Sequence, residues 1–303
     1  MLTLAQKGRL YQRYLCCLNT RLDMIAFTRQ MFDQLLDQVE VILHPSGDAL
    51  LYLIKDDICY LTFIMSIDES NFKSLLESLD QVVKEKHIPI IKLHFHNPIK
   101  IPWMPLPDVT HPNYPGFPKD DPRAEWLFAK GYEIHSTEEL YYIDLNNTLD
   151  RLFDSRVDFY QTNDEDQLKF FISQIHHPEW ENALLDVMEH PEKPLLVAKH
   201  NHEIVGFTGP LSVETSKRGS FTGIMVLEKA RHLGLGTALF HRLAIELNDM
   251  GAEYLTLFTG KTNPAKTIYQ SLGGKVVKEF YTLKKITGWR SSRVIFFGNR
   301  FTC

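Results

Sequence analysis

The sequence predicts a mixed α/β fold in which two domains follow one another, each a mostly antiparallel central sheet flanked by helices. The chain has 303 residues, about twice the length of a common domain. Apolar residues recur at helical spacing in some segments and gather in short β-like runs in others. Both kinds of segment follow the same order in the two halves, which indicates a repeat of domain size.

Composition and charge exclude several classes of protein. Hydrophobic residues make up 44% of the chain and charged residues 23%, a globular balance that argues against disorder and fibrous repeats. A net charge of -5 argues against a general nucleic-acid binder and mildly favours a cationic substrate. No apolar run reaches the roughly 20 residues of a membrane span, and no signal-peptide cleavage site follows the amino terminus. We expect a cytoplasmic protein with no nucleic-acid or membrane partner.

The first half begins with helical periodicity, which the turn Pro45-Ser46-Gly47-Asp48 interrupts. Further on, Asp68 and Ser70 offer N-caps for a helix with a leucine stripe, and Gly131 suits the residue after a short helix. The expected elements of this half are helices over 1–40, 71–85 and 123–130, strands over 49–54, 59–67 and 88–95, and a β-hairpin over 132–145 that turns at 136–138.

Prolines crowd residues 97–122, where regular structure is not expected because proline fixes φ and lacks an N–H donor. We interpret this proline-rich segment as an ordered loop or lid and not as a domain linker. With Trp103, His111 and Tyr114 it covers an interface or shapes the mouth of a substrate site.

The second half repeats this order. Asp164 is placed to cap its first helix, and a strand leads through a glycine-spaced loop into a longer helix. The expected elements are strands over 157–161, 195–199, 203–211, 219–226 and 252–258, helices over 164–175, 181–189, 236–250 and 264–271, a hairpin over 276–286 and a last strand over 293–297.

The two halves match at one offset. Pro122 and Gly131 correspond to Pro264 and Gly273, since 264 minus 122 and 273 minus 131 both give 142. We interpret this match as an internal duplication and place the boundary at 146–148, which gives domains over 1–148 and 149–303. The first domain has no counterpart of the glycine-spaced loop.

The segment from Thr222 to Leu239 is the strongest candidate for a ligand site. Gly234 and Gly236 allow the backbone to lie close against a ligand, and the N–H groups that open a helix bind anions. Arg231 adds a positive charge. The loop lacks the GK[ST] of a phosphate-binding ATPase and the third glycine of a dinucleotide turn. A purely steric role of the two glycines is the alternative.

A second motif makes the first one specific. Arg231-x-x-Gly234-x-Gly236, followed by Asn263-Pro-Ala and by Tyr269 ahead of Leu272-Gly273, resembles the GNAT acetyltransferase superfamily over residues 151–286, in a tandem arrangement. The resemblance implies that acetyl-CoA is the co-substrate, that Asn263 contacts it and that Tyr269 protonates the departing thiolate. The strand residues implied to line the pantetheine arm are Ile224, Met225 and Val226. The loop residues implied to hold the pyrophosphate are Arg231, His232, Leu233, Gly234, Leu235, Gly236 and Thr237.

The residue types suit acetyl transfer to an amine. A phenol within reach of the sulfur can act as a general acid, and a strand-edge N–H can polarise the thioester. The alternative for Tyr269 is an aromatic packed on the sheet. No base is identified: Glu214 and Glu228 have the chemistry to act through water, but glutamates near turns are usually solvated. Trp180, after His176-His177, is a candidate wall of the acceptor pocket, with core packing as its alternative.

Neither the histidines nor the cysteines predict a metal. His94 and His96 alternate along one expected strand, but no third ligand lies nearby, so packing is the favoured interpretation. The cysteines show no CxxC pair and no dense spacing, which favours reduced structural thiols over disulfides or zinc ligands; they are Cys16, Cys17, Cys59 and Cys303.

At the offset of 142, Leu127 takes the place of Tyr269, and a leucine cannot donate a proton. We therefore interpret the first domain as a degenerate GNAT-like copy without the acetyl-CoA loop. The expected activity is an acetyl-CoA-dependent N-acetyltransferase with one site per chain, whose acceptor is an amine of a small molecule or peptide. The alternatives are a non-catalytic acyl-CoA-binding or regulatory protein and a structural duplicate whose glycines serve a turn. Assembly into a homodimer is left open.

Overall fold

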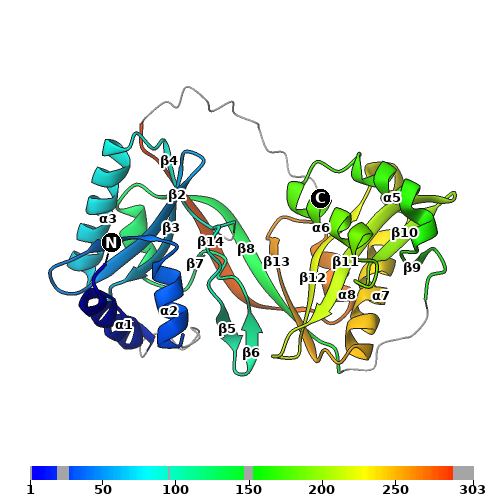
Figure 1. Ribbon diagram of the computed structural model, residues 1–303, viewed down its shortest axis with the longest axis horizontal. Coiled ribbons are helices and arrows are strands. Elements are labelled where there is room, and N and C mark those ends of the chain that lie inside the picture. The colour runs from blue at the N-terminus through cyan, green and yellow to red at the C-terminus, as the bar shows by residue number, and fades with distance from the viewer. Residues whose placement is uncertain (1, 19–26, 95, 147–152, 289–303) are drawn as a thin grey trace. The chain divides into compact units, whose positions relative to one another are not determined.

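The structure, a computed structural model, describes residues 2–18, 27–94, 96–146 and 153–288 (Figure 1). The chain forms two compact units. Among the described residues, the first unit holds those up to 140 and from 277 to 288, and the second holds those from 141 to 276. This division differs from the expected boundary at 146–148, because two long strands pass from one unit to the other partway along their length.

In the first unit, strand order is β1-β2-β3-β4-β14-β8. Neighbours are antiparallel from β1 to β3 and between β14 and β4, whereas β3 and β4 are parallel. The strands are β1 (Glu40–Leu43), β2 (Ala49–Lys55), β3 (Ile58–Met65), β4 (Ile90–Leu93), β8 (Glu133–Asp144) and β14 (Lys275–Ile286), with the last residues of β8 and the first of β14 in the second unit.

Alternate residues of β2 face different helices of the first unit. Ala49 and Leu51 face one buried cluster with helices α1 (Leu4–Leu18) and α2 (Arg29–Leu36). Leu50 and Tyr52 face another with α3 (Glu69–Glu85) and α4 (Ala124–Phe128). Because successive strand residues point to opposite faces, the sheet is covered by helices on both sides.

The second unit has the same plan, with strand order β8-β13-β12-β11-β10-β9. Strand β12 (Arg218–Val226) is parallel to β13 (Tyr254–Gly260). From β12 to β9 neighbouring strands are antiparallel, through β11 (Glu203–Val213), β10 (Leu196–His200) and β9 (Val157–Phe159). One face packs on α5 (Glu165–Ile172) and α6 (Pro178–Glu189), and the other on α7 (Leu235–Asp249) and α8 (Lys266–Ser271). The expected mixed α/β fold, with mostly antiparallel strands flanked by helices in each unit, is confirmed.

The duplication extends to element bounds. Strands β8 and β14 each have twelve residues, and both their starts and their ends are 142 positions apart, since 275 minus 133 and 286 minus 144 give the same value. Helices α4 and α8 also begin 142 positions apart. Gly131 and Gly273, which follow them, have similar φ angles of 81° and 74°.

Two expected hairpins are wrong: residues 132–145 and 276–286 form the single strands β8 and β14. The polar stretch 136–138 resembled a turn, but it lies within β8, where its polar groups are satisfied across the sheet. Ser136 N donates to Thr282 Oγ1 at 3.0 Å, and the two hydroxyls are 2.7 Å apart. In the sequence, a polar stretch inside one strand therefore looked the same as a turn that joins two strands.

The proline-rich segment is more regular than expected. It contains a two-stranded hairpin of β5 (Trp103–Leu106) and β6 (Val109–His111), turning at Asp108 with φ 60°, and β7 (Phe117–Pro118) pairs with β14. Proline is tolerated here because these are short edge pairings. Trp103 is fully buried, with its ring edge-on to Tyr114 and Phe280 at 5.2 and 5.1 Å.

Three smaller differences concern single features. Strand β1 was not expected, and the expected strand at 293–297 lies outside the described residues. Asp164 precedes α5 but makes no side-chain cap; its carboxylate instead accepts two 2.8 Å bonds from Lys199. Cys16, Cys17 and Cys59 form no disulfide within the described residues, whereas Cys303 lies outside them. Over the described ranges, none of the helices has the length and apolar character to cross a bilayer.

Candidate functional site

The loop from β12 to α7 is fixed at its ends and exposed in its middle. Leu227 and Ala230 are buried around a 3-10 turn over Glu228–Ala230. His232 and Leu233 are exposed, and His232 has a φ of 65°. Gly234 then adopts a left-handed conformation with φ 78° directly before α7, which a residue with a Cβ disfavours. The loop therefore has a defined backbone path and an accessible surface.

Helix α7 begins with free donors. Gly234 gives no side-chain cap, and the first backbone bond runs from Ala238 N to Gly234 O at 3.0 Å. The N–H groups of Leu235, Gly236 and Thr237 precede that bond, and they meet no acceptor in the part of the chain that the structure describes. Such N–H groups, at the positive end of a fifteen-residue helix, favour a bound anion.

Strand β12 is open along one edge. It pairs with β13 only at Arg218–Tyr254 and Gly219–Leu255, so its remaining residues have β11 on one side alone. Leu227 N donates to Val205 O on the β11 side at 2.8 Å. Because hydrogen-bonding direction alternates along an antiparallel pair, the N–H groups of Ile224 and Val226 point to the open side. These are two of the three strand residues expected to line the pantetheine arm.

Arg231 joins the loop to this open edge. Its side chain is half-buried, and Nε donates to Val226 O at 3.4 Å. That contact comes from the side away from β11, which agrees with the direction assigned to Val226. The guanidinium therefore lies at the end of the strand, where the loop begins.

Gly236 packs closely against the next helix. A Cβ at this position would lie 3.3 Å from Ile268 Cδ1 of α8 and 3.9 Å from Val226 Cγ2. The steric explanation of this glycine therefore holds at least in part, since a larger residue would press on α8. The same packing brings α8 next to the helix start, so the two sequence motifs meet in space.

Asn263 shapes the turn between β13 and α8. Its Oδ1 accepts from Ala265 N at 2.9 Å, and its backbone N donates to Gly260 O at 2.8 Å. The side-chain nitrogen donates to none of the described residues. This residue therefore has a structural role that the resemblance did not imply.

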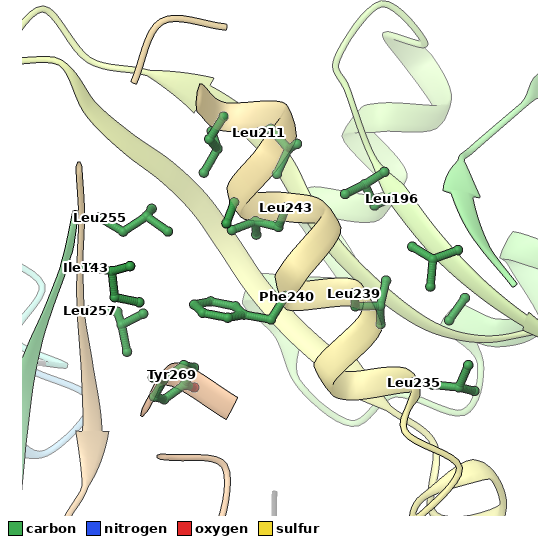
Figure 2. Packing of buried hydrophobic residues seen from close by; sticks show 14 of the residues in the cluster. Ile143, Leu196, Leu211, Leu235, Leu239, Phe240, Leu243, Leu255, Leu257 and Tyr269 are labelled. Carbon is green, nitrogen blue, oxygen red and sulfur yellow. The ribbon is translucent and has the colours of Figure 1, made fainter. Parts of the chain in front are cut away.

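Tyr269 is an aromatic packed in the core of the second unit. It is 7% exposed, and its ring centroid lies 5.0 Å from Phe240 of α7 and 5.6 Å from Tyr141 of β8. Figure 2 shows it below Phe240, near Leu257 and Ile143. Core packing therefore explains the position of the Tyr269 ring. Only the hydroxyl group of Tyr269 is left for a chemical role.

The two glutamates considered as bases are not brought to the open strand edge. Glu214 accepts a 2.6 Å bond from Arg218, at the end of β12 opposite Val226. Glu228 is exposed in the loop. No base therefore emerges from the two glutamates. His94 and His96 lie in the first unit with ring centroids 5.6 Å apart, and the described residues gather no cluster of three or more groups suited to a metal.

Sequence reasoning missed a close contact at Gly223. A Cβ there would lie 2.5 Å from Trp180 Nε1, so the indole rests directly on the strand backbone next to Ile224. His177 stacks on the same indole with a centroid distance of 4.3 Å. Thr208 holds the strand from the other side, since its hydroxyl donates to Gly223 O at 3.1 Å. The available signal was a glycine within a strand, which often marks close approach of another group.

The second unit of this mixed α/β protein therefore combines an open strand edge, a loop rich in donors and an uncapped helix start. These features together suit an extended ligand that carries phosphate. Residues 149–273 match the model of the acetyltransferase (GNAT) family. The second half of the chain is therefore a domain of the GNAT acetyltransferase family, over the residues that the model matches.

Solved structures extend the likeness to both units. A GCN5-related N-acetyltransferase from Sphaerobacter thermophilus has 13% identity and a TM-score of 0.64, with 94% of each chain covered. A tandem GNAT protein from the clavulanic acid biosynthesis pathway has 11% identity and a TM-score of 0.60, with 95% of this chain and 96% of that one covered.

A third likeness is to the GCN5-related glucosamine N-acetyltransferase region of a fungal multi-domain GH3 β-N-acetylglucosaminidase. It has 14% identity and a TM-score of 0.60, and it covers 86% of this chain but only 35% of the fungal one. At these identities the likenesses establish the tandem-GNAT fold alone. No curated protein matches the sequence.

Proposed function

We propose that the chain is an acetyl-CoA-dependent N-acetyltransferase whose site lies in the second unit, along β12 and the start of α7. The observation that carries this proposal is the open edge of β12, which leaves the N–H groups of Ile224 and Val226 without strand partners next to the donors of α7. Donors in this arrangement suit an extended ligand with a thioester at one end and phosphate at the other.

Each residue then has a role. Acetyl-CoA supplies the acetyl group as a thioester. Ile224 or Val226 N–H donates to the thioester oxygen and stabilises the charge that develops there. Arg231 and the backbone from His232 to Thr237 hold the pyrophosphate. The acceptor reacts as the neutral amine, after any ammonium proton has passed to water. Its nitrogen bonds to the carbonyl carbon as the carbon–sulfur bond breaks, its surplus proton passes to water, and the Tyr269 hydroxyl supplies a proton to the thiolate and regains one from water.

We propose one such site per chain, because the first unit fills the corresponding place with its own side chains. Only 66–68 separate β3 from α3, against 227–234 in the second unit. The buried carboxylate of Asp48 lies there, accepting from Ser66 Oγ at 2.7 Å and Asn71 Nδ2 at 3.0 Å and pairing with Arg13. A phosphate would have to displace this carboxylate.

We propose an amine of a small molecule or peptide as the acceptor, with the stacked pair His177 and Trp180 beside it at Gly223. The acceptor would then approach the thioester from the α6 side of β12. The net charge of -5 agrees with a cationic acceptor, although it does not select one.

The competing proposal is a non-catalytic acyl-CoA-binding or regulatory protein, which the absence of an assigned base favours. Calorimetric titration with CoA and an acetyl-CoA assay of thiol release over a panel of amines separate the two. Binding together with amine-dependent thiol release supports the enzyme. Binding without release from any amine supports the regulatory protein, and the absence of CoA binding contradicts both.

A further inference from the structure

A buried arginine lies where strands β12 and β13 separate. Arg218 begins the parallel ladder opposite Tyr254, and one more pair follows before the pairing stops. The guanidinium of Arg218 reaches across to β13, where Nε donates to Thr256 Oγ1 at 2.7 Å and Nη2 donates to Thr256 O at 3.0 Å. The register places Thr256 opposite Ser220. The guanidinium therefore binds the first residue of β13 beyond the last strand pair.

The carbonyl of Thr256 is directed toward β12. Leu145, directly after β8, donates its N–H to Glu253 O at 2.9 Å, so the carbonyl of Glu253 faces β8. Successive residues of a strand direct their backbone groups to opposite neighbours. The carbonyl of Thr256, three residues further on, therefore faces β12, in agreement with its bond from Arg218.

The backbone donor that would match this carbonyl belongs to Phe221. Glu214 N donates to Arg218 O at 2.9 Å, so the backbone of Arg218 faces β11. By the same alternation, the N–H of Phe221 faces β13. If the parallel ladder continued, Thr256 O would accept from Phe221 N–H. Arg218 Nη2 donates to that oxygen in the structure, at the point where β12 leaves β13.

Strand β12 is irregular just beyond this point. Phe221 contacts Phe240 of α7, with a centroid distance of 6.3 Å, whereas Gly223 faces Trp180 of α6. Residues two apart in a regular strand share one face, so one extra residue lies between them, as in a β-bulge. The N–H groups of Phe221 and Ile224 therefore both point to the open side of β12.

The burial of Thr256 explains why a side-chain donor matters here. Thr256 is 0% exposed, so water does not reach its carbonyl, and buried carbonyl groups need hydrogen-bond donors. Two strands that separate inside the core give up the backbone donors of their ladder. By donating to Thr256 O, the guanidinium of Arg218 replaces such a donor and offsets the cost of the separation.

The first unit shows the same ladder without an arginine. Strands β3 and β4 begin their parallel pairing at Ile58, whose side chain cannot donate a hydrogen bond. Their pairing continues to a third pair, Tyr60 with Lys92. In the second unit the third pair is absent, and the guanidinium of Arg218 binds at that position. The copy that has the arginine therefore separates its strands one pair earlier.

A purely structural ion pair is the alternative explanation of Arg218. Nη1 donates to Glu214 Oε1 at 2.6 Å, and the two residues close the turn between β11 and β12. This pair accounts for Nη1 alone. It does not require the bonds from Nε and Nη2 to Thr256, because Thr256 lies on β13 and not in the turn.

We propose that Arg218 is a positioning residue for acetyl transfer, which holds β12 apart from β13 and so keeps the N–H groups of Ile224 and Val226 open to the ligand. The inference rests on the proposed function for the identity of that ligand. Without the guanidinium, Phe221 N–H would pair with Thr256 O, and β12 would close along the edge where the pantetheine arm is proposed to bind.

Amide hydrogen exchange of the full chain without ligand, followed by NMR, tests the strand separation directly. Arg218→Met keeps an unbranched side chain but removes every donor. We expect the amides of Phe221 and Ile224 to exchange at least about tenfold more slowly in this variant than in the parent protein, because β12 closes on β13. Unchanged or faster exchange would overturn the proposal. Since no ligand is present, this result does not depend on whether the chain transfers acetyl.

Calorimetry with two ligands tests the consequence for the site. CoA should bind Arg218→Met about tenfold more weakly, the effect of about one lost hydrogen bond. ADP has the pyrophosphate but no pantetheine arm, so it should keep its affinity at the start of α7. Unchanged CoA affinity, or an equal loss for both ligands, would refute the positioning role. If the parent protein binds no CoA, the proposed function fails, and the exchange experiment still decides the role of Arg218.

Two further variants keep the result specific. Arg218→Lys retains a cation beside Glu214 but lacks the planar fork that donates to two acceptors. It should lie between the parent protein and Arg218→Met in amide exchange and in CoA affinity, and parent-like exchange would count against the proposal even if the methionine variant failed to fold. Arg242→Met removes a partly buried arginine that pairs with Glu246 at 2.5 Å in the same i,i+4 spacing. It should change neither measurement, and slower exchange there would show a non-specific effect of losing an arginine.

Discussion

Leu127 and Tyr269 occupy the same place in the two units, 142 positions apart. Leu127 O accepts from Tyr132 N at 3.2 Å, and Tyr269 O accepts from Gly274 N at 3.0 Å, where 132 and 274 also differ by 142. Both side chains are buried in short helices that precede β8 and β14. The backbone of the duplicated element is thus the same, and a phenol hydroxyl is present in the second copy alone.

Tyr269→Phe isolates that hydroxyl. The phenyl ring keeps its contacts with Phe240 and Tyr141, so we expect unchanged CoA affinity and a kcat lower by about 10²–10⁴-fold, the range for loss of a general acid. Steady-state kinetics with calorimetric CoA binding measure the two effects. Tyr142→Phe, which removes a hydroxyl from a tyrosine of the same unit stacked on Tyr254, is the control. Equal kcat in parent and Tyr269→Phe would remove this residue from the mechanism.

Gly236 tests the helix start as an anion site. Alanine there places a Cβ 3.3 Å from Ile268 and beside the donors of α7, so we expect CoA to bind about tenfold more weakly, a change of about 1.4 kcal/mol. Valine should abolish binding, because its methyl groups fill the space next to those N–H donors. Calorimetry with CoA measures both.

Gly8→Ala serves as the matched control for these glycine variants. Gly8 lies inside α1, and its Cβ would meet nothing closer than Arg29 Nη1 at 3.6 Å. Alanine should raise the free energy of unfolding by about 0.5–1 kcal/mol and leave CoA binding unchanged. If Gly236→Ala also bound CoA with the parent affinity, its role would be packing alone.

Sequence reasoning succeeded where local signals agree with the final structure. The turn at 45–48, the cap at Asp68 and the two glycine-ended helices all depend on neighbouring residues, and the structure contains each of them. The prediction of a turn failed at Ser136 and Glu138, because neither the contacts of these residues with distant parts of the chain nor their burial can be read from the neighbouring sequence. The same limit applies to the site: the motifs located the loop, but not the contact of Trp180 with Gly223, which depends on how α6 packs on β12.

Gly223→Ala examines the acceptor side of the site. Its Cβ would lie 2.5 Å from Trp180 Nε1 and 2.8 Å from Cε2, so the indole must move away from β12. We expect the KM for the amine to rise several-fold while CoA affinity stays unchanged, since the displaced group lies on the α6 side of the strand. Trp180→Phe keeps an aromatic ring of smaller size and should produce a weaker effect. A change in CoA affinity with an unaltered amine KM would contradict this assignment.

Asp48 is expected to stabilise the first unit. Its carboxylate is buried and is bound by Arg13, Ser66 and Asn71. Asp48→Ala leaves three donors without an acceptor, which should lower the free energy of unfolding by about 3 kcal/mol. Chemical denaturation followed by circular dichroism measures the change. Asp120→Ala, at an exposed position in the turn between β7 and α4, is the control. A loss below about 1 kcal/mol, the net value of one hydrogen bond, would show that the network is not stabilising.

Glu138 predicts a dependence of stability on pH. Burial raises the pKa of this carboxyl above its ordinary value of 4.5, although a hydrogen bond from Ser136 opposes the shift. Because the folded state holds the proton more tightly than the unfolded chain, Glu138 stabilises the fold below pH 4.5 and loses that contribution as the pH rises through the folded pKa. Glu138→Gln keeps an acceptor for Ser136 without a charge. It should therefore be more stable than the parent protein at pH 7, with a difference that shrinks as the pH falls toward 4.5. Denaturant midpoints at several pH values measure this, with exposed Glu133→Gln on the same strand as the control. A stability difference that is constant with pH would mean that the Glu138 carboxyl titrates alike in the folded and unfolded chains.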